Sequence, residues 1–261
     1  MDPTPFEQAL GRVGDRRLDR SLDIAPLSKK NELKPWRKKQ WCIASKQSAA
    51  FVCSMEDVLE VYQRERDPDY PLVCLDETTK ELHGHSREPM PVRPSQIARV
   101  DSEYLRAGVG TLFMLNAPLE GWREVIVTER KTRQDYAKIL RKLSDECFPD
   151  AKKIILVQDN LNTHNPTSLY ETFPAQEARR LAERFEVHYT PKHGSWLNMA
   201  EIELNVLSSQ CLSCRIPNMQ RLCLHTKAWV EQRNRQKAKI QWRFRTSEAR
   251  IKLQHLYPKF V

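Results

Sequence analysis

The strongest constraint on the fold comes from two short apolar runs that each end at an aspartate. Residues 72–75 follow Pro71 and precede Asp76, and residues 153–158 precede Asp159. Each run is too short for a helix and is flanked by polar residues, which is typical of a buried strand. The sequence therefore predicts a sheet with a carboxylate at the end of two of its strands.

The remaining periodicity predicts an α/β protein with a mixed sheet. Further strands are expected at 111–116, 124–128 and 185–190, and helices at 54–66, from Thr132, and at 174–184, 198–212, 217–235 and 247–256. The three early strands can form an antiparallel meander, whereas the later strands alternate with helices and so require parallel pairing through right-handed crossovers. We expect a five-stranded mixed sheet with helices on both faces. Residues 78–110 are expected to be a long irregular excursion with weak hairpins.

Charge is unevenly distributed along the 261 residues. The net charge is +9, but residues 29–46 carry +6 and residues 215–261 carry +10, which leaves −7 for the rest. Basic flanks favour a polyanionic partner, although such runs are also common as solvated faces. Together with the predicted elements, this pattern divides the chain into an N-terminal tail, basic linker and helix (1–66), a core that holds the predicted sheet (67–214) and a basic C-terminal helical extension (215–261).

Composition excludes several classes of protein. None of the 7 glycines forms a GxxxxGK[ST] or complete GxGxxG loop, so the usual ATP and NAD sites are excluded. The longest apolar runs have four or five residues, far fewer than a spanning helix requires. No export signal is visible and the cysteines number 7, so we expect reduced thiols in the cytoplasm. Cys211 and Cys214 allow a zinc site, but their spacing favours cysteines buried in a helix.

Three acidic residues stand where a divalent cation could bind. Asp76 and Asp159 follow strands, and Glu201 lies in the first turn of the helix after the fifth strand. Ligand sites in open α/β sheets form at the carboxyl ends of strands, so neighbouring strands would bring the two aspartates together. Adjacent carboxylates repel, and Mg²⁺ relieves that repulsion while it binds phosphate oxygens. Two such ions can activate an attacking oxygen and stabilise a leaving one.

Each acid also has an ordinary structural explanation. Asp76 could belong to a turn, and Asp159 could form an Asx turn. Asn198 and Glu201 match a capping box, in which the glutamate bonds back to the helix start. Glu203 competes with Glu201 for the same role, but the two point about 200° apart around a helix and cannot reach one ion together.

Three segments, taken together, resemble a known family. They are Leu75-Asp76-Glu77, then VQDNLNTH at 157–164, and YTPKHGSWLNMAE at 189–201. In this order, and at these strand and helix ends, they resemble the DDE transposases of bacterial insertion sequences related to the Tc/mariner group. The resemblance extends from about Lys29 to Pro258.

The resemblance implies a ribonuclease H-like fold and a catalytic, metal-binding triad of Asp76, Asp159 and Glu201. It also implies two Mg²⁺ or Mn²⁺ ions and phosphoryl transfer on DNA, in which water cuts element ends and a freed 3′-hydroxyl attacks target DNA. Similar proteins act on double-stranded DNA as homodimers and would work in the bacterial cytoplasm, at the nucleoid.

Further residues take supporting roles under this resemblance. His164 matches a recurring histidine of the family, which could position phosphate or Asp159, although a purely structural role is nearly as plausible. The other expected supporting residues near the acids are Glu77, Asn160 and Asn162. Expected DNA contacts are Lys34, Arg37, Lys38, Lys39, Lys192 and His193.

The chain departs from the family pattern in two respects. Relatives carry an N-terminal helix-turn-helix region, whereas only about 28 residues precede the matching segment here, so a truncated or replaced N-terminus is expected. The 41 residues between Asp159 and Glu201 are a few more than is usual, and residues 165–174 are expected to be a surface insertion. The alternatives to a transposase are a non-catalytic DNA-binding remnant that modulates an intact enzyme, and another ribonuclease H-like nuclease.

Overall fold

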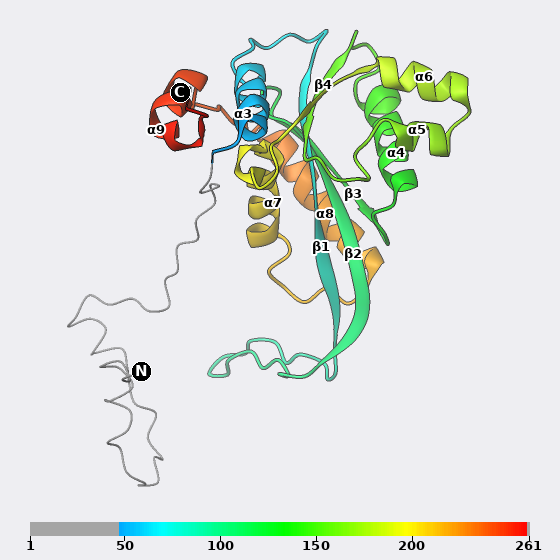
Figure 1. Cartoon of the computed structure of the whole chain (residues 1–261). Coiled ribbons are helices and arrows are strands. Elements are labelled where there is room, and N and C mark those ends of the chain that lie inside the picture. The colour runs from blue at the N-terminus through cyan, green and yellow to red at the C-terminus, as the bar shows by residue number, and fades with distance from the viewer. Residues whose placement is uncertain (1–46, 260–261) are drawn as a thin grey trace, which may run out of the picture. The chain divides into compact units, whose positions relative to one another are not determined.

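The fold is built on one mixed five-stranded sheet (Figure 1). The computed structural model describes residues 47–259. The strands are β1 (Leu72–His85), β2 (Tyr104–Ala117), β3 (Trp122–Thr128), β4 (Ile154–Gln158) and β5 (Phe185–Tyr189), in the spatial order β3-β2-β1-β4-β5. β1, β2 and β3 pair antiparallel, whereas β4 is parallel to both β1 and β5. The predicted mixed α/β sheet is confirmed.

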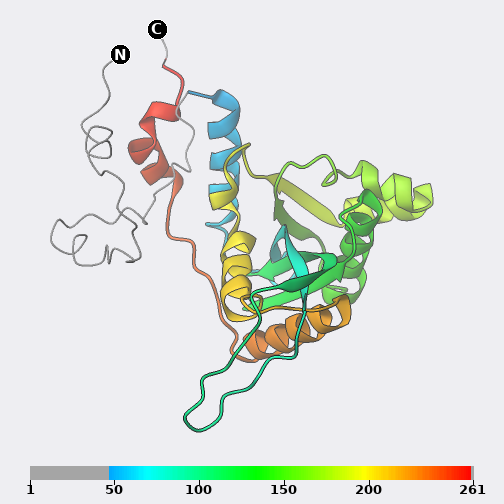
Figure 2. The same ribbon diagram turned by 90° about the horizontal axis from the view of Figure 1, so that it is seen from below.

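Helices cover both faces of this sheet (Figure 2). One face carries α3 (Ala49–Val61), α7 (Met199–Gln210) and α8 (Met219–Arg235), with α9 (Thr246–Lys252) against α3, and the other carries α4 (Arg133–Lys142), α5 (Thr167–Thr172) and α6 (Ala175–Glu183). Short helical turns complete the described part: η1 (Leu143–Cys147), η2 (Ser195–Leu197) and η3 (Gln254–Leu256).

The alternation of side chains along β1 divides the core into two layers. Leu72 and Cys74 pack with residues of α3 and α7, whereas Val73 and Leu75 pack with residues of α4 and α6. By the same period, Asp76 belongs to the α7 side and Glu77 to the α4 side. β1 and β4 pair with Cys74 opposite Val157. Asp76 and Asp159 each come two residues later, so they lie at the same level of the sheet.

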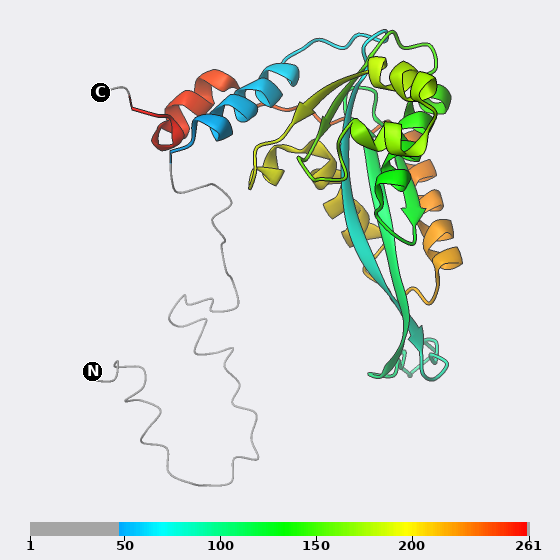
Figure 3. The same cartoon turned by 45° about the vertical axis from the view of Figure 1, so that its right-hand side comes forward.

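The first two strands are much longer than the sequence indicates (Figure 3). β1 continues to His85 and pairs with β2 from Tyr104 onwards, with one register shift between Glu81 and His83. The prediction that β1 ends at Asp76 was therefore wrong. The predicted irregular excursion is shorter than expected and covers 86–103, where two isolated antiparallel bridges form a weak hairpin. Apart from the buried Leu82, the outer halves of β1 and β2 are exposed or half-buried, so they lack the apolar pattern by which a strand is recognised.

Local capping explains where several helices begin. Thr132 forms a capping box with Asp135, and α4 begins directly after it, in agreement with the helix predicted from Thr132. Ser48 caps α3 by accepting a hydrogen bond from Phe51 N at 3.2 Å, so this helix starts earlier than predicted. The segment 165–174, expected to be a surface insertion, contains α5. None of the helices in the described range has the length and hydrophobicity to cross a membrane.

Candidate active site at the carboxyl end of β4

Three carboxylates converge beside the carboxyl end of β4. Asp76 comes from β1, Asp159 directly follows β4, and Glu201 comes from the first turn of α7. Burial raises the pKa of Asp76 to about 7, although Glu77 N donates a hydrogen bond to its Oδ1 at 2.8 Å. The negative charges of Asp159, Glu77 and Glu201 contribute to the same rise in pKa. The fold thus gathers the three acids named from the sequence into one electrostatically coupled group.

Asn198 joins the start of α7 to β1. Its Nδ2 donates to Leu75 O at 2.8 Å and to Asp76 Oδ2 at 3.3 Å, while its Oδ1 accepts from Ala200 N at 3.1 Å. An amide side chain can cap a helix through its oxygen and donate two hydrogen bonds through its nitrogen, whereas a hydroxyl has one proton to donate and a carboxylate has none. The sequence predicted the cap but missed the bond to Asp76. The choice of asparagine, rather than serine or aspartate, was the available signal.

Glu201 and Glu203 face different surroundings. With Asn198 accepting from Ala200 N, the Glu201 carboxylate lies on the Asp76 side, and its Oε2 is buried with no hydrogen-bond partner among residues 47–259. Glu203 instead lies 3.2 Å from Arg123 Nε and accepts from Arg233 Nη2 at 2.7 Å. The two acids are therefore separated as the helical spacing predicts.

His164 supports Asp159 from the α4 side of the sheet. Its Nδ1 contacts Asp159 Oδ1 and its Nε2 lies 3.3 Å from Glu77 Oε2, so the ring lies between the two carboxylates. The Tyr136 ring stacks on the imidazole at 4.8 Å. The His164 carbonyl accepts from Gln158 Nε2 and from the Tyr189 hydroxyl, each at 3.1 Å. The histidine is thus fixed in both position and orientation.

Glu77 completes this supporting group. The pKa of Glu77 is raised, because the effect of burial exceeds the opposing effect of the nearby His164. Lys131 Nζ lies 3.5 Å from Glu77 Oε1. Ligand atoms of Glu77, Asp159 and His164 all lie within 4.8 Å of one another, which no other three His, Cys, Asp or Glu residues of the described segment achieve. Since both ring nitrogens of His164 already contact carboxylates, the ring orients Asp159 in this arrangement.

The donor set fits a hard divalent cation. Asp76, Asp159 and Glu201 offer only oxygen atoms, as Mg²⁺ and Mn²⁺ prefer. Asp76 is half-buried beside like charges, and Glu201 leaves a buried oxygen unpaired. Both costs are relieved by a bound cation, because it supplies positive charge beside the carboxylates.

A groove of about 450 Å³ lies beside the acids and contains some of the expected DNA contacts. Asn160, Lys192 and His193 line it together with residues from the start of α3. Asn162 is exposed on the same loop as His164 but does not line the groove. The other expected contacts lie outside the described residues: Lys34, Arg37, Lys38 and Lys39.

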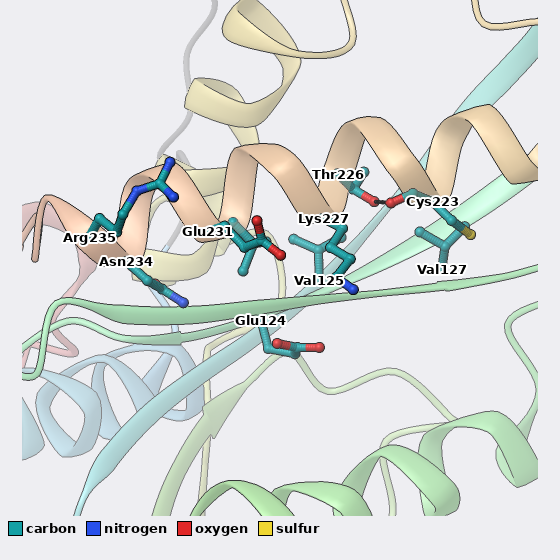
Figure 4. Close-up of a pocket in the computed structure, with 10 residues that line it drawn as sticks. Glu124, Val125, Val127, Cys223, Thr226, Lys227, Glu231, Asn234 and Arg235 are labelled. Atoms are coloured by element: carbon teal, nitrogen blue, oxygen red, sulfur yellow. Dashed lines mark hydrogen bonds between the residues drawn. The ribbon is translucent and has the colours of Figure 1, made fainter.

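A larger cavity of about 700 Å³ lies elsewhere, between β3 and α8 (Figure 4). Val125, Val127 and Val230 form its apolar lining, and Cys223 is among its other residues. None of Asp76, Asp159 and Glu201 lines it.

The prediction that Cys211 and Cys214 are buried in a helix was wrong. Cys214 and Cys223 are exposed, and Cys211 follows the end of α7.

The strand order and the acids at the carboxyl end of β4 define a ribonuclease H-like enzyme. Proteins of this class transfer phosphoryl groups with the help of divalent metal ions. A family model described as "DDE superfamily endonuclease" matches residues 71–223. The match covers more than half of the chain, so the chain belongs to the DDE superfamily endonucleases. The resemblance predicted from the three sequence segments is confirmed.

A solved structure has a similar fold. The Mos1 transposase paired-end complex with left transposon end is 14% identical, with a TM-score of 0.51, and the match covers 82% of this chain and 69% of that chain. The mariner Mos1 paired end complex with Mg is also 14% identical, with a TM-score of 0.49 and coverage of 97% and 88%. At this identity the first match establishes the fold alone. A search of curated proteins finds no match.

Proposed function

We propose that this chain is the catalytic domain of a DNA transposase, which cuts and joins DNA at insertion-sequence ends. The observation that carries the proposal is the convergence of Asp76, Asp159 and Glu201 in a DDE-family endonuclease. The fold it shares with Mos1 transposase, whose structure contains a transposon end, supports transposition over other nuclease functions.

In this proposal Asp76, Asp159 and Glu201 hold two Mg²⁺ or Mn²⁺ ions. Such ions, when bound, activate the attacking oxygen and stabilise the leaving oxygen. The other residues keep the three carboxylates in place before DNA arrives. His164, braced by Glu77, orients Asp159, and Asn198 orients Asp76. Loss of residues that orient metal ligands typically lowers metal affinity or activity about 10–100-fold.

In this proposal, DNA binds in the groove beside Asp159. Lys192 and His193 would contact phosphates there, and Asn160 would contact the strand or orient Asp159. The basic residues Lys34, Arg37, Lys38 and Lys39 would add a further phosphate-binding surface. Pairing of two element ends would involve a homodimer, working in the bacterial cytoplasm at the nucleoid.

Strand transfer is the step that distinguishes a transposase from a simple nuclease. The purified chain is incubated with supercoiled plasmid, Mn²⁺ and a duplex of the element's terminal inverted repeat that carries a 3′-hydroxyl. We expect covalently joined products, and none from a matched duplex whose end is 3′-deoxy, because the hydroxyl is the attacking group.

Three outcomes contradict the proposal. Equal joining of both duplexes would show that the 3′-hydroxyl is not the nucleophile. DNA binding without any cutting or joining would support the non-catalytic remnant. Faster cutting of an RNA–DNA hybrid than of duplex DNA would support a ribonuclease.

A further inference from the structure

A buried ion cluster joins α7 to two distant parts of the chain. Glu203 on α7 is 1% exposed and lies between Arg123 of β3, which is 0% exposed, and Arg233 of α8, which is 18% exposed. Arg233 Nη2 donates to Glu203 Oε1 at 2.7 Å, and Arg123 Nε lies 3.2 Å from Oε2. One carboxylate therefore ties together three elements.

Further hydrogen bonds tie β3 and α7 to α8. Arg123 N donates to Asn234 Oδ1 at 2.9 Å, and Asn234 Nδ2 donates to Arg123 O at 2.8 Å, which locks β3 to α8. Two turns beyond Glu203, Gln210 accepts a hydrogen bond from Trp229 Nε1 at 2.9 Å. Residues seven apart lie on the same side of a helix, so α8 grips one side of α7 at two levels.

Stability alone does not account for this cluster. Burying charged groups costs desolvation free energy, and apolar residues of similar volume often serve stability equally well. Burial and the neighbouring Arg233 lower the pKa of Arg123, and the Glu203 charge opposes that shift. The hydrogen bond from Arg233 to Glu203 does, however, fix distance and direction, and the Arg123 charge attracts the same carboxylate, whereas the apolar contacts of α7 specify its rotation less strictly.

We propose that Glu203 is a positioning residue for the active site. Held by Arg123 and Arg233, it fixes the rotation of α7 and thereby keeps Glu201 facing Asp76. Glu201 lies two residues away and about 200° around the helix, so any rotation of α7 displaces the Glu201 carboxylate. This inference rests on the proposed function of the acid group.

Mn²⁺ binding to the full chain, followed by electron paramagnetic resonance, tests this role without measuring activity. The variant Glu203→Gln keeps the shape of the side chain but removes its charge. We expect Mn²⁺ affinity to fall about tenfold, as for other groups that orient metal ligands. The matched control is Leu181→Ala, which destabilises the fully buried side of α6 on the opposite face of the sheet. It should lower the thermal midpoint and leave Mn²⁺ affinity within about twofold of wild type, because it does not touch α7.

A second variant covers the case in which Glu203→Gln does not fold. Arg233→Met, at the partly exposed edge of the cluster, removes one partner and should weaken Mn²⁺ binding about threefold or more. Affinities within about twofold of wild type in a folded variant would overturn the positioning role. Failure of the wild-type chain itself to bind Mn²⁺ would overturn both this role and the proposed function.

Discussion

Asp76 illustrates how a single residue can favour function over stability. Its carboxyl group is buried beside Asp159 and Glu201, and its pKa is raised to about 7. In the unfolded chain the same group has its ordinary pKa of 3.8. The folded protein therefore holds a proton that the unfolded chain releases between these two values. Stability consequently falls as pH rises from about 4 to about 7, and the loss persists at higher pH.

Replacing Asp76 with asparagine should therefore stabilise the metal-free protein at pH 8. We expect Asp76→Asn to raise the free energy of unfolding by ~2 kcal/mol in EDTA, with the gain disappearing near pH 4. Urea denaturation at the two pH values measures this. The control Asp145→Asn removes an exposed partner of Arg180 and should cost at most ~1 kcal/mol at pH 8. A wild-type chain as stable as Asp76→Asn at pH 8 would refute the account of the buried carboxyl.

The choice between Glu201 and Glu203 shows the limit of sequence reasoning at this scale. Helical spacing predicts that the two acids point apart, and the family motif favours Glu201. Glu203 pairs with Arg123 and Arg233, which lie 80 and 30 residues away along the chain. Only the packing of β3 and α8 on α7 brings them together, and no local pattern encodes that packing.

Among the elements, the start of α7 carries the most direct link between fold and site. Asn198→Ala should lose the helix cap and also the bonds to Leu75 O and Asp76 Oδ2, at a total cost of ~2 kcal/mol. Asn218 caps α8 through Arg221 N at 2.9 Å, so Asn218→Ala should lose only the cap, or ~1 kcal/mol. Calorimetry and Mn²⁺ titration compare the two variants. Only Asn198→Ala should weaken Mn²⁺ binding, and an equal effect of both would contradict this link.

Elements with a buried face could be predicted, and those without one could not. β4 is buried along its whole length, so its apolar run identified it almost to the residue. The outer half of β1 pairs with β2 and has only Leu82 buried, so backbone hydrogen bonds hold it with little apolar burial. α5 escaped prediction because only Ser168 and Leu169 of its six residues are buried, too few to set a period.

Across the whole molecule, charge separates into regions with different tasks. The net −7 of the stretches outside 29–46 and 215–261 includes Asp76, Asp159 and Glu201. Part of the basic C-terminal region serves the fold, since Arg233 binds Glu203 and Arg250 binds Glu56 on α3. The charge of that region is therefore not all available to DNA, which the sequence alone could not reveal.

Metal-dependent DNA cleavage tests the central claim most directly. Nicking of supercoiled plasmid is compared in wild type, Asp159→Asn and the control Asp145→Asn, with Mg²⁺, Mn²⁺ or EDTA. We expect wild type and Asp145→Asn to nick only with metal, and Asp159→Asn to be slower by about 10³-fold or more with unchanged DNA affinity, because a carboxylate that holds the metal is lost. Equal nicking by Asp159→Asn and wild type would contradict the assignment of the active site.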